Sequence, residues 1–216
     1  MSANIKGFIF DLDGVITDTA EYHYKSWQSL ADEEGLFFNR EINEQLRGVS
    51  RMDSLEIILD GKELPEKTKK EWTDRKNSYH QEYLEEITKE NILDDMEAKL
   101  NNLKKRGYKI AVASSSRNAR KVLKNLQISD MFDTISDGNS VENAKPAPDL
   151  FLHTAEKLDL KPEECVVLED AESGVEAALA AEMKAVGVGP QERVGKAHLV
   201  YETVDAVDIE EIIEKL

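Results

Sequence analysis

Short apolar runs alternate with amphipathic segments along most of the chain. The run at 7–10 predicts a buried strand, and similar runs predict strands at 110–113, 134–136, 165–168, 185–188 and 199–201. Apolar residues at helical spacing predict helices at 96–107, 118–126, 148–158, 174–181 and from 208 onward. Strands that alternate with helices predict an α/β fold with a doubly wound, Rossmann-like parallel sheet.

This alternation is interrupted between residues 17 and 91, where helical patterns follow one another without a predicted strand. We therefore expect two domains, an α/β core formed by 1–16 and 92–216 and an inserted helical cap formed by 17–91. One cap helix is expected after Asp18, with Glu21 completing a capping box, and another is expected to start at Ser50. A long charged helix should follow Pro65. Its apolar residues at helical spacing are Trp72, Tyr79, Tyr83 and Ile87.

The acidic composition limits the classes of partner. The 216 residues include 28 Lys and Arg against 44 Asp and Glu, a formal charge of −16 that opposes binding to nucleic acid or anionic membranes. Cys165 is the single cysteine, so an internal disulfide is impossible and a reducing compartment fits. No apolar run reaches membrane-spanning length and no signal peptide is predicted. We expect a cytoplasmic monomer that acts on a small molecule.

Two carboxylates, Asp11 and Asp13, follow the first predicted strand. Ligands of parallel sheets bind at the carboxyl ends of the strands, and a carboxylate there can attack phosphorus if a cation offsets its charge. Asp11 is therefore the candidate nucleophile and Asp13 the candidate general acid and base. The alternative is a polar turn after a strand. A calcium-binding loop is disfavoured because the regular acidic spacing and a glycine at the sixth place are missing.

Three later segments place further polar groups at the same expected edge of the sheet. Glu169 and Asp170 follow the strand at 165–168 and offer the hard oxygen ligands that Mg²⁺ prefers, although they could instead be an acidic helix start. The serines at 114–116 could bind phosphate or cap a helix. Lys145 could supply positive charge to the site or lie on a surface loop.

The formal charges favour one joint site. Asp11, Glu169 and Asp170 together carry −3, which Mg²⁺ and Lys145 would balance with +3. Without cations, like charges about 4 Å apart would repel by roughly 4 kcal/mol per pair at an effective dielectric constant near 20. If the four segments meet at one site, the positive groups therefore account for how the negative groups can lie close together.

In this order, the four segments resemble the haloacid dehalogenase superfamily: an Asp-x-Asp loop, a serine after the second strand, a lysine and a late acidic pair. The stretches 11–23 and 43–54, together with Trp27, more specifically resemble the β-phosphoglucomutase family within it, and the similarity covers nearly the whole chain. The resemblance implies that phospho-Asp11 phosphorylates β-glucose 1-phosphate to β-glucose 1,6-bisphosphate. Return of the other phosphoryl group to Asp11 would release glucose 6-phosphate.

Two other functions remain open from the sequence. A sugar phosphatase of the same superfamily would share the core motifs and would hydrolyse a hexose phosphate with water as the acceptor. A phosphosugar-binding protein without catalytic activity would retain the fold, but the intact set of polar residues argues against it.

The resemblance also implies roles for individual residues. Mg²⁺ would be bound by Asp11, Glu169, Asp170 and the backbone carbonyl of Asp13. The residues that would hold the transferring phosphate are Ser114, Ser115 and Lys145. Those that would hold the distal phosphate are Arg51, Ser116, Arg117 and Asn118. The other substrate-binding residues, which would face the sugar or the cap hinge, are Thr19, His23, Trp27, Gly48, Val49, Ser54 and Lys76.

Some cap residues leave more than one interpretation. Arg47 stands where the family pattern has lysine, and a guanidinium is not a neutral substitute for an ammonium group. Asp94-Asp95 stands in place of Pro-Gly near the expected hinge, where it should change how the cap closes. His23 and Trp27, one helical turn apart, could simply pack in the cap. Arg51 could be a solvated charge at a helix start.

Overall fold

The computed structural model describes residues 5–93 and 95–216, so Asp94 of the Asp94-Asp95 pair lies outside the described residues. It contains a six-stranded sheet in the order β3-β2-β1-β4-β5-β6, with all neighbouring strands parallel. The strands are β1 (Gly7–Phe10), β2 (Lys109–Ala113), β3 (Thr134–Ser136), β4 (Cys165–Glu169), β5 (Lys184–Val188) and β6 (Leu199–Tyr201). The predicted doubly wound parallel sheet is confirmed.

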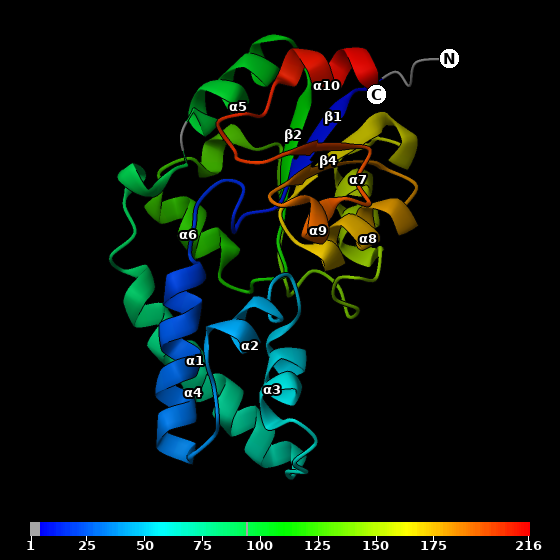
Figure 1. Cartoon of the computed structure of the whole chain (residues 1–216). Helices are drawn as coiled ribbons and strands as arrows, with labels where there is room; N and C mark the ends of the chain where they lie inside the picture. Colours follow the sequence, from blue (N-terminus) through cyan, green and yellow to red (C-terminus); the bar gives the residue numbers. More distant parts are fainter. Residues whose placement is uncertain (1–4, 94) are drawn as a thin grey trace.

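Helices cover both faces of this sheet (Figure 1). Phe8 and Phe10 pack on the face covered by α5 (Met96–Lys105), α6 (Ala119–Asn125) and α10 (Ile209–Lys215). Ile9 points to the opposite face, which is covered by α7 (Asp149–Leu158), α8 (Glu172–Ala180) and α9 (Gln191–Val194). Successive strand residues alternate between the two hydrophobic clusters, as the pleat requires. Two short 3-10 helices, Ser129–Met131 and Pro162–Glu164, connect elements of the core.

Between β1 and α5 the described residues form four α-helices, which we call the cap. They are α1 (Ala20–Glu34), α2 (Arg40–Glu44), α3 (Arg51–Leu59) and α4 (Glu66–Leu84), and a 3-10 helix at Lys89–Asn91 follows them. The cap lies beyond the carboxyl ends of the strands (Figure 1) and has a hydrophobic cluster of its own around Trp27, Leu30 and Leu55. The expectation that 17–91 folds as an independent domain stays a prediction.

The buried face of α4 differs from the face that the sequence suggests. Trp72, Tyr79 and Tyr83 are only partly buried, and Ile87 lies beyond the end of the helix. The buried residues are Thr73, Lys76, His80 and Leu84. The face is shifted by one residue because α4 borders a polar cavity, where a lysine and a histidine are enclosed. Apolar periodicity alone cannot predict such a face.

The start of α1 also differs from prediction. Asp18 accepts a hydrogen bond from the Ala20 backbone N–H at 2.9 Å, but Glu21 forms an ion pair with Arg40 at 3.0 Å instead of completing a capping box. The predicted start at Ser50 is confirmed, because its hydroxyl accepts a hydrogen bond from the Asp53 N–H at 3.2 Å.

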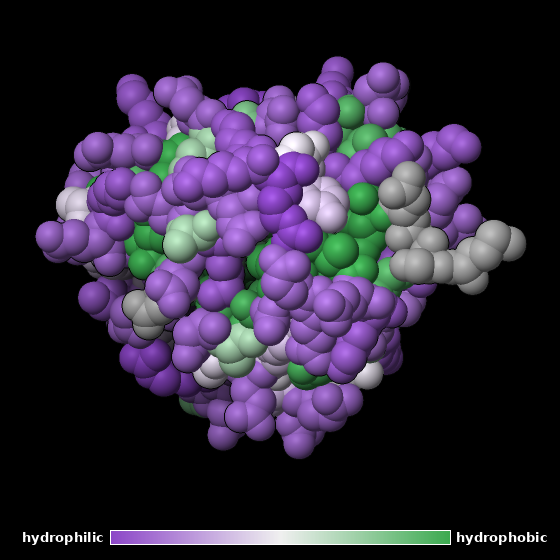
Figure 2. All heavy atoms as spheres, turned by 90° about the horizontal axis from the view of Figure 1, so that it is seen from above, coloured by the Kyte–Doolittle hydropathy of each residue, from purple (hydrophilic) through white to green (hydrophobic). Residues whose placement is uncertain are grey.

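The surface at one end of the molecule is mainly hydrophilic. Figure 2 shows the molecule from the end at which α5 and α10 lie, where hydrophilic residues predominate and hydrophobic residues appear in small areas. Within the described part of the chain, no helix combines the length and apolar character that crossing a membrane requires.

Candidate active site

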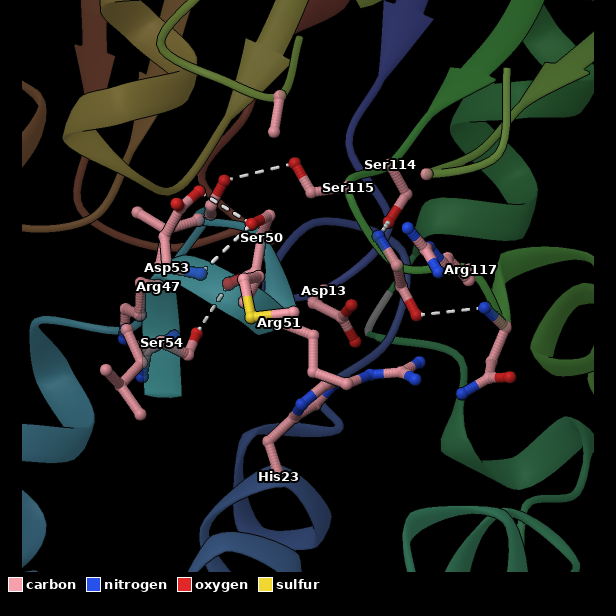
Figure 3. A pocket seen from close by; sticks show the side chains of 18 of the residues that line it. Asp13, His23, Arg47, Ser50, Arg51, Asp53, Ser54, Ser114, Ser115 and Arg117 are labelled. Atoms are coloured by element: carbon pink, nitrogen blue, oxygen red, sulfur yellow. Dashed lines mark hydrogen bonds between the residues drawn. The ribbon is translucent and has the colours of Figure 1, made fainter. Parts of the chain in front are cut away.

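A cavity of about 530 Å³ lies between the cap and the carboxyl ends of the strands, and residues from both units line it (Figure 3). Most of the predicted site residues line this cavity. Thr19, Lys145 and Glu169 do not line it. Thr19 and Lys145 contact the lining residues Asp13 and Asp11, respectively, and Glu169 contacts Lys145. The structure therefore brings together the residues that the sequence analysis selected, although they are far apart along the chain.

Three carboxylates form a buried group at the ends of two neighbouring strands. Asp11, Glu169 and Asp170 each offer an oxygen, and these oxygens lie within 4.8 Å of one another. β1 and β4 set this geometry, because they pair with Phe10 opposite Leu168 and the next residues carry the carboxylates. A side chain at Gly174 would overlap the Glu169 carboxylate, so glycine is needed there.

Lys145 is enclosed beside the carboxylates and is only 1% exposed. Its ammonium group lies 2.6 Å from Asp11 Oδ1, also pairs with Glu169, and donates a hydrogen bond to the Ala113 carbonyl at 2.9 Å. Burial alone would lower the pKa of Lys145, but Asp11 and Glu169 raise it above its ordinary value. The alternative of a surface-loop lysine is wrong.

The electrostatics of this group fit a divalent cation. Burial, with repulsion from Asp11, raises the pKa of Asp170 to about 6, and burial also raises the pKa of Glu169. Three carboxylates and one ammonium leave a formal charge of −2 in a buried space. Hard oxygen ligands with that residual charge suit Mg²⁺, which binds few protein ligands.

Asp13 lies apart from these three carboxylates and faces the cavity (Figure 3). The Thr19 hydroxyl donates a hydrogen bond to Asp13 Oδ1, which explains why Thr19 does not cap α1 with its side chain. Burial and then the nearby Asp11 raise the pKa of Asp13 to about 7. A carboxylate with such a pKa can both give and take a proton near neutral pH.

Positive charge gathers on another part of the cavity wall. Arg51 and Arg117 line it together with Lys76, and in the described residues none of the three forms an ion pair within 4.0 Å. Burial and then Arg117 lower the pKa of Arg51. Asn77 holds this region in place, since its Oδ1 accepts hydrogen bonds from Arg51 at 2.8 Å and from Asn118 at 2.9 Å. Arg51 is therefore more than a solvated helix-start charge.

Two histidines and a tryptophan surround Lys76. Its ammonium group lies 3.1 Å from His23 Nδ1 and 5.0 Å from the centre of the Trp27 ring. The His80 ring packs 4.0 Å from that of His23. His23 and Trp27 both line the cavity, while Trp27 also belongs to the cap cluster. Packing in the cap and lining the site are therefore compatible.

The loop after α2 brings the cap into contact with the core. The Ser115 hydroxyl donates a hydrogen bond to the Gly48 carbonyl at 3.0 Å. A side chain at Gly48 would come within 2.9 Å of the Ala171 Cβ atom. Of the serines at 114–116, Ser116 also supports the start of α6, because its hydroxyl accepts a hydrogen bond from the Asn118 N–H at 3.2 Å directly before Ala119. The Ser54 hydroxyl donates a hydrogen bond to the Ser50 carbonyl at 2.9 Å within α3.

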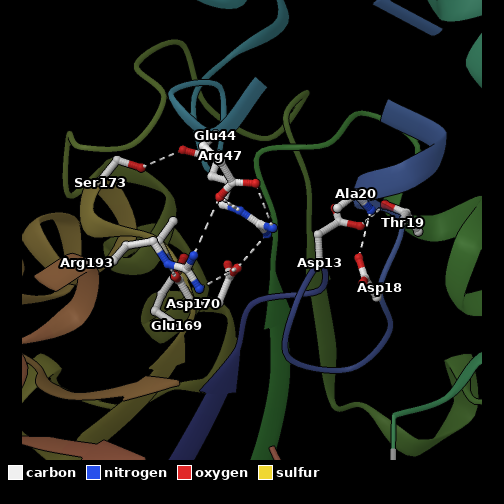
Figure 4. A network of polar contacts seen from close by, with 11 residues as sticks. Asp13, Asp18, Thr19, Ala20, Glu44, Arg47, Glu169, Asp170, Ser173 and Arg193 are labelled. Carbon is white, nitrogen blue, oxygen red and sulfur yellow. Dashed lines mark hydrogen bonds and ion pairs between the residues drawn. The ribbon is translucent and has the colours of Figure 1, made fainter. Parts of the chain in front are cut away.

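Sequence reasoning missed several residues at this site. Arg47 was noted without a role, and the structure places its guanidinium 3.1 Å from Asp170 and 2.8 Å from Glu44 (Figure 4). The residues missed altogether are Glu44, Asn77, His80 and Arg193. Glu44 and Arg193 are one acid and one base among many in a highly charged chain. One feature of the sequence could have indicated Asn77 and His80. They follow Lys76, a predicted site residue, by one and four positions on the same helix.

The burial of Lys76 gives a prediction about stability. Burial, with Arg51 contributing, lowers the pKa of Lys76 from 10.5 to about 7. Below about pH 7 the folded protein bears the full cost of enclosing the ammonium group, and this cost falls as the pH rises toward 10.5, where the unfolded chain also loses the proton. Lys76→Met should therefore raise the unfolding free energy by about 1 to 3 kcal/mol at pH 6 and by less at pH 9.

Denaturant unfolding at both pH values measures this difference. Lys67→Met provides a matched control, because Lys67 lies on the same helix with its side chain 88% exposed, and it should show no such pH dependence. An equal change at pH 6 and pH 9 for Lys76→Met would contradict the prediction.

The fold and the site together define an α/β enzyme of the phosphoryl-transfer class, with carboxylates at the strand ends and an inserted helical cap. The chain belongs to the haloacid dehalogenase-like hydrolase family, whose model matches residues 8–188. This membership confirms the resemblance seen in the sequence.

Individual relatives narrow the comparison. The chain is 42% identical to "Beta-phosphoglucomutase" of Bacillus subtilis over 215 residues, which is 98% of this chain and 95% of that protein. It is 31% identical to "Phosphorylated carbohydrates phosphatase" of Thermotoga maritima, with 98% of each chain covered. The crystal structure of β-phosphoglucomutase from Clostridium difficile superposes with a TM-score of 0.94 at 42% identity, covering 98% of this chain and 96% of that chain.

Proposed function

We propose that this protein is a β-phosphoglucomutase that interconverts β-D-glucose 1-phosphate and glucose 6-phosphate. The main structural support is that one cavity combines two kinds of anion-binding group. Ser114 and Lys145 lie beside Asp11 at the carboxyl ends of the strands, while Arg51 and Arg117 supply separate positive charge. A sugar bisphosphate needs both, because one phosphoryl group must react while the other is held.

In this proposal Asp11 is the nucleophile. Its carboxylate attacks the phosphorus of β-glucose 1,6-bisphosphate, the phosphorus–oxygen bond to the sugar breaks, and Asp13 gives a proton to the departing sugar oxygen. In the reverse sense, Asp13 takes the proton from a sugar hydroxyl as that oxygen attacks the phosphoryl group on Asp11. The pKa of about 7 for Asp13 suits both directions.

The residues around Asp11 hold the transferring phosphoryl group and its charge. Lys145 and the hydroxyl groups of Ser114 and Ser115 would bind phosphoryl oxygens. Mg²⁺ held by Asp11, Glu169, Asp170 and the Asp13 carbonyl would neutralise the charge that develops during transfer. Arg51, Ser116, Arg117 and Asn118 would bind the distal phosphate.

The remaining residues of the set would select and enclose the sugar. The substrate-binding assignments on the cap side are Thr19, His23, Trp27, Gly48, Val49, Ser54 and Lys76. Contacts such as the hydrogen bond between Ser115 and Gly48 support a position of this wall over Asp11, where it would exclude water. Exclusion of water matters for a mutase, since the phosphoryl group on Asp11 must reach a sugar hydroxyl before water attacks it.

A sugar phosphatase is the second candidate function, supported by the phosphatase relative that matches over the whole chain. One assay separates the two functions. The purified protein is given β-glucose 1-phosphate, Mg²⁺ and a trace of β-glucose 1,6-bisphosphate, and both glucose 6-phosphate and inorganic phosphate are measured. We expect glucose 6-phosphate in large excess. Inorganic phosphate as the main product would contradict the proposal and identify a phosphatase.

A further inference from the structure

Four charged side chains form a closed ring across the boundary between cap and core (Figure 4). The cap contributes Glu44 and Arg47, and the core contributes Asp170 and Arg193. Around the ring, the contacts are 2.8 Å between Arg47 and Glu44, 3.1 Å between Arg47 and Asp170, 4.0 Å between Asp170 and Arg193, and 3.7 Å between Arg193 and Glu44. Each positive charge therefore lies between two negative charges.

The pairing across the boundary is reciprocal. A cap cation, Arg47, contacts a core anion, Asp170, while a core cation, Arg193, contacts a cap anion, Glu44. Both contacts between the units must break when the cap moves away from the core. The two contacts that lie within one unit can persist during that movement. The ring is therefore a charge arrangement that favours the closed position of the cap.

The backbone around Arg193 fixes the position of its guanidinium group. Its Nε–H donates a hydrogen bond to the Asp170 carbonyl at 2.7 Å. Gly189 has a positive φ of 133°, and a Cβ atom there would lie 2.6 Å from Arg193 Nη2, so a glycine leaves the space that the guanidinium occupies. Arg193 thus stays beside the boundary whether or not Glu44 is present, which prepares it to attract the cap.

We propose that Arg193 and Glu44 are positioning residues that latch the cap over the core, in addition to the contact between Arg47 and Asp170. Neither residue touches the reacting atoms. Their effect on the reaction rests on the proposed function: a longer closed time would keep water from the phosphoryl group on Asp11. The latch itself is a property of the protein alone and can be measured without any sugar.

Cap closure can be measured by energy transfer between two dyes. Glu63 in the cap loop before α4 and Lys105 at the end of α5 are exposed, so Glu63→Cys and Lys105→Cys provide labelling sites, whereas the native Cys165 is buried. Single-molecule measurements then give the ratio of closed to open molecules. Because the ring is partly exposed, we expect Glu44→Gln or Arg193→Gln to lower this ratio about two- to five-fold.

Three further measurements separate a latch from a general structural effect. The double variant Glu44→Gln with Arg193→Gln should have the same closed ratio as each single variant. Either change alone already removes the ion pair between Glu44 of the cap and Arg193 of the core. Arg193→Lys keeps the positive charge, so its closed ratio should lie between that of the unaltered chain and that of Arg193→Gln. Added KCl should lower the closed ratio of the unaltered chain more than that of the variants.

Lys196→Gln is the matched control. Lys196 lies three residues after Arg193 and is exposed, but its partners Glu172 and Glu176 both belong to α8 of the core. This change should leave the closed ratio unchanged. An unaltered closed ratio in both Glu44→Gln and Arg193→Gln would overturn the latch, and so would fully additive effects in the double variant.

A kinetic readout connects the latch to the reaction. After phosphorylation of the protein, Glu44→Gln should release about two to five times more inorganic phosphate for each glucose 6-phosphate formed. If the proposed function fails, no glucose 6-phosphate appears with any variant, while the dye measurement still decides whether the latch exists. A loosened cap with an unchanged product ratio would reject the part of the inference that concerns water.

Discussion

Replacing Asp11 with asparagine should reduce turnover by roughly 10⁶-fold, a loss of the size seen when an enzyme's nucleophile is removed. The amide has the same shape, and its oxygen can still accept a hydrogen bond from Lys145, which lies 2.6 Å from Asp11 Oδ1. It cannot form the acyl phosphate, because an amide oxygen is a poor nucleophile and carries no charge. The measurement is the initial rate of glucose 6-phosphate formation under saturating substrate and Mg²⁺.

A folded protein is needed to interpret this loss. Circular dichroism and the unfolding midpoint of Asp11→Asn should stay close to those of the unaltered protein, since the core packing around β1 does not change. Turnover within ten-fold of the unaltered rate would reject Asp11 as the nucleophile.

Replacing Asp13 with asparagine should give the second largest effect, a loss of about 10² to 10⁴-fold in kcat. The side chain faces the cavity and receives a hydrogen bond from Thr19, so an amide can occupy the same place. It can neither take a proton from the attacking sugar hydroxyl nor return one. This proton transfer is measured by the rate at which protein phosphorylated on Asp11 passes its phosphoryl group to added sugar phosphate.

A matched variant tests the role of the neighbouring hydroxyl. Thr19→Val removes the hydrogen bond to Asp13 but leaves the proton-transferring carboxylate, so its effect on kcat should be much smaller than that of Asp13→Asn. Equal losses in the two variants would mean that the position of the side chain, and not proton transfer, is what matters.

Much of the core could be predicted because its signals are local and the sheet is parallel. The strand at 7–10 is a short apolar run with a carboxylate directly after it, and the structure pairs it between β2 and β4. Once the strands are known to be parallel, their carboxyl ends must share one edge. For this reason Asp11, Ser114 and Glu169 could be expected together although they come from three separate parts of the sequence.

The cap was less predictable because its buried face is polar. Lys76 and His80 lie inside α4 against the cavity, so the apolar residues of that helix mark a neighbouring face. Glu44 and Arg193 could not be selected because surface charge is abundant in this sequence, and their contact depends on how the cap docks on the core. A local pattern contains no information about that docking.

The proposed function depends above all on the transfer of a phosphoryl group to Asp11 with the aid of a divalent cation. The most direct test incubates the protein with β-glucose 1,6-bisphosphate, with Mg²⁺ or with a chelator, and then locates the phosphoryl group by peptide mass spectrometry. We predict one phosphoryl group on the peptide that contains Asp11, present with Mg²⁺ and absent with the chelator. A phosphoryl group on another residue, or an unmodified protein in the presence of Mg²⁺ and the bisphosphate, would contradict the account.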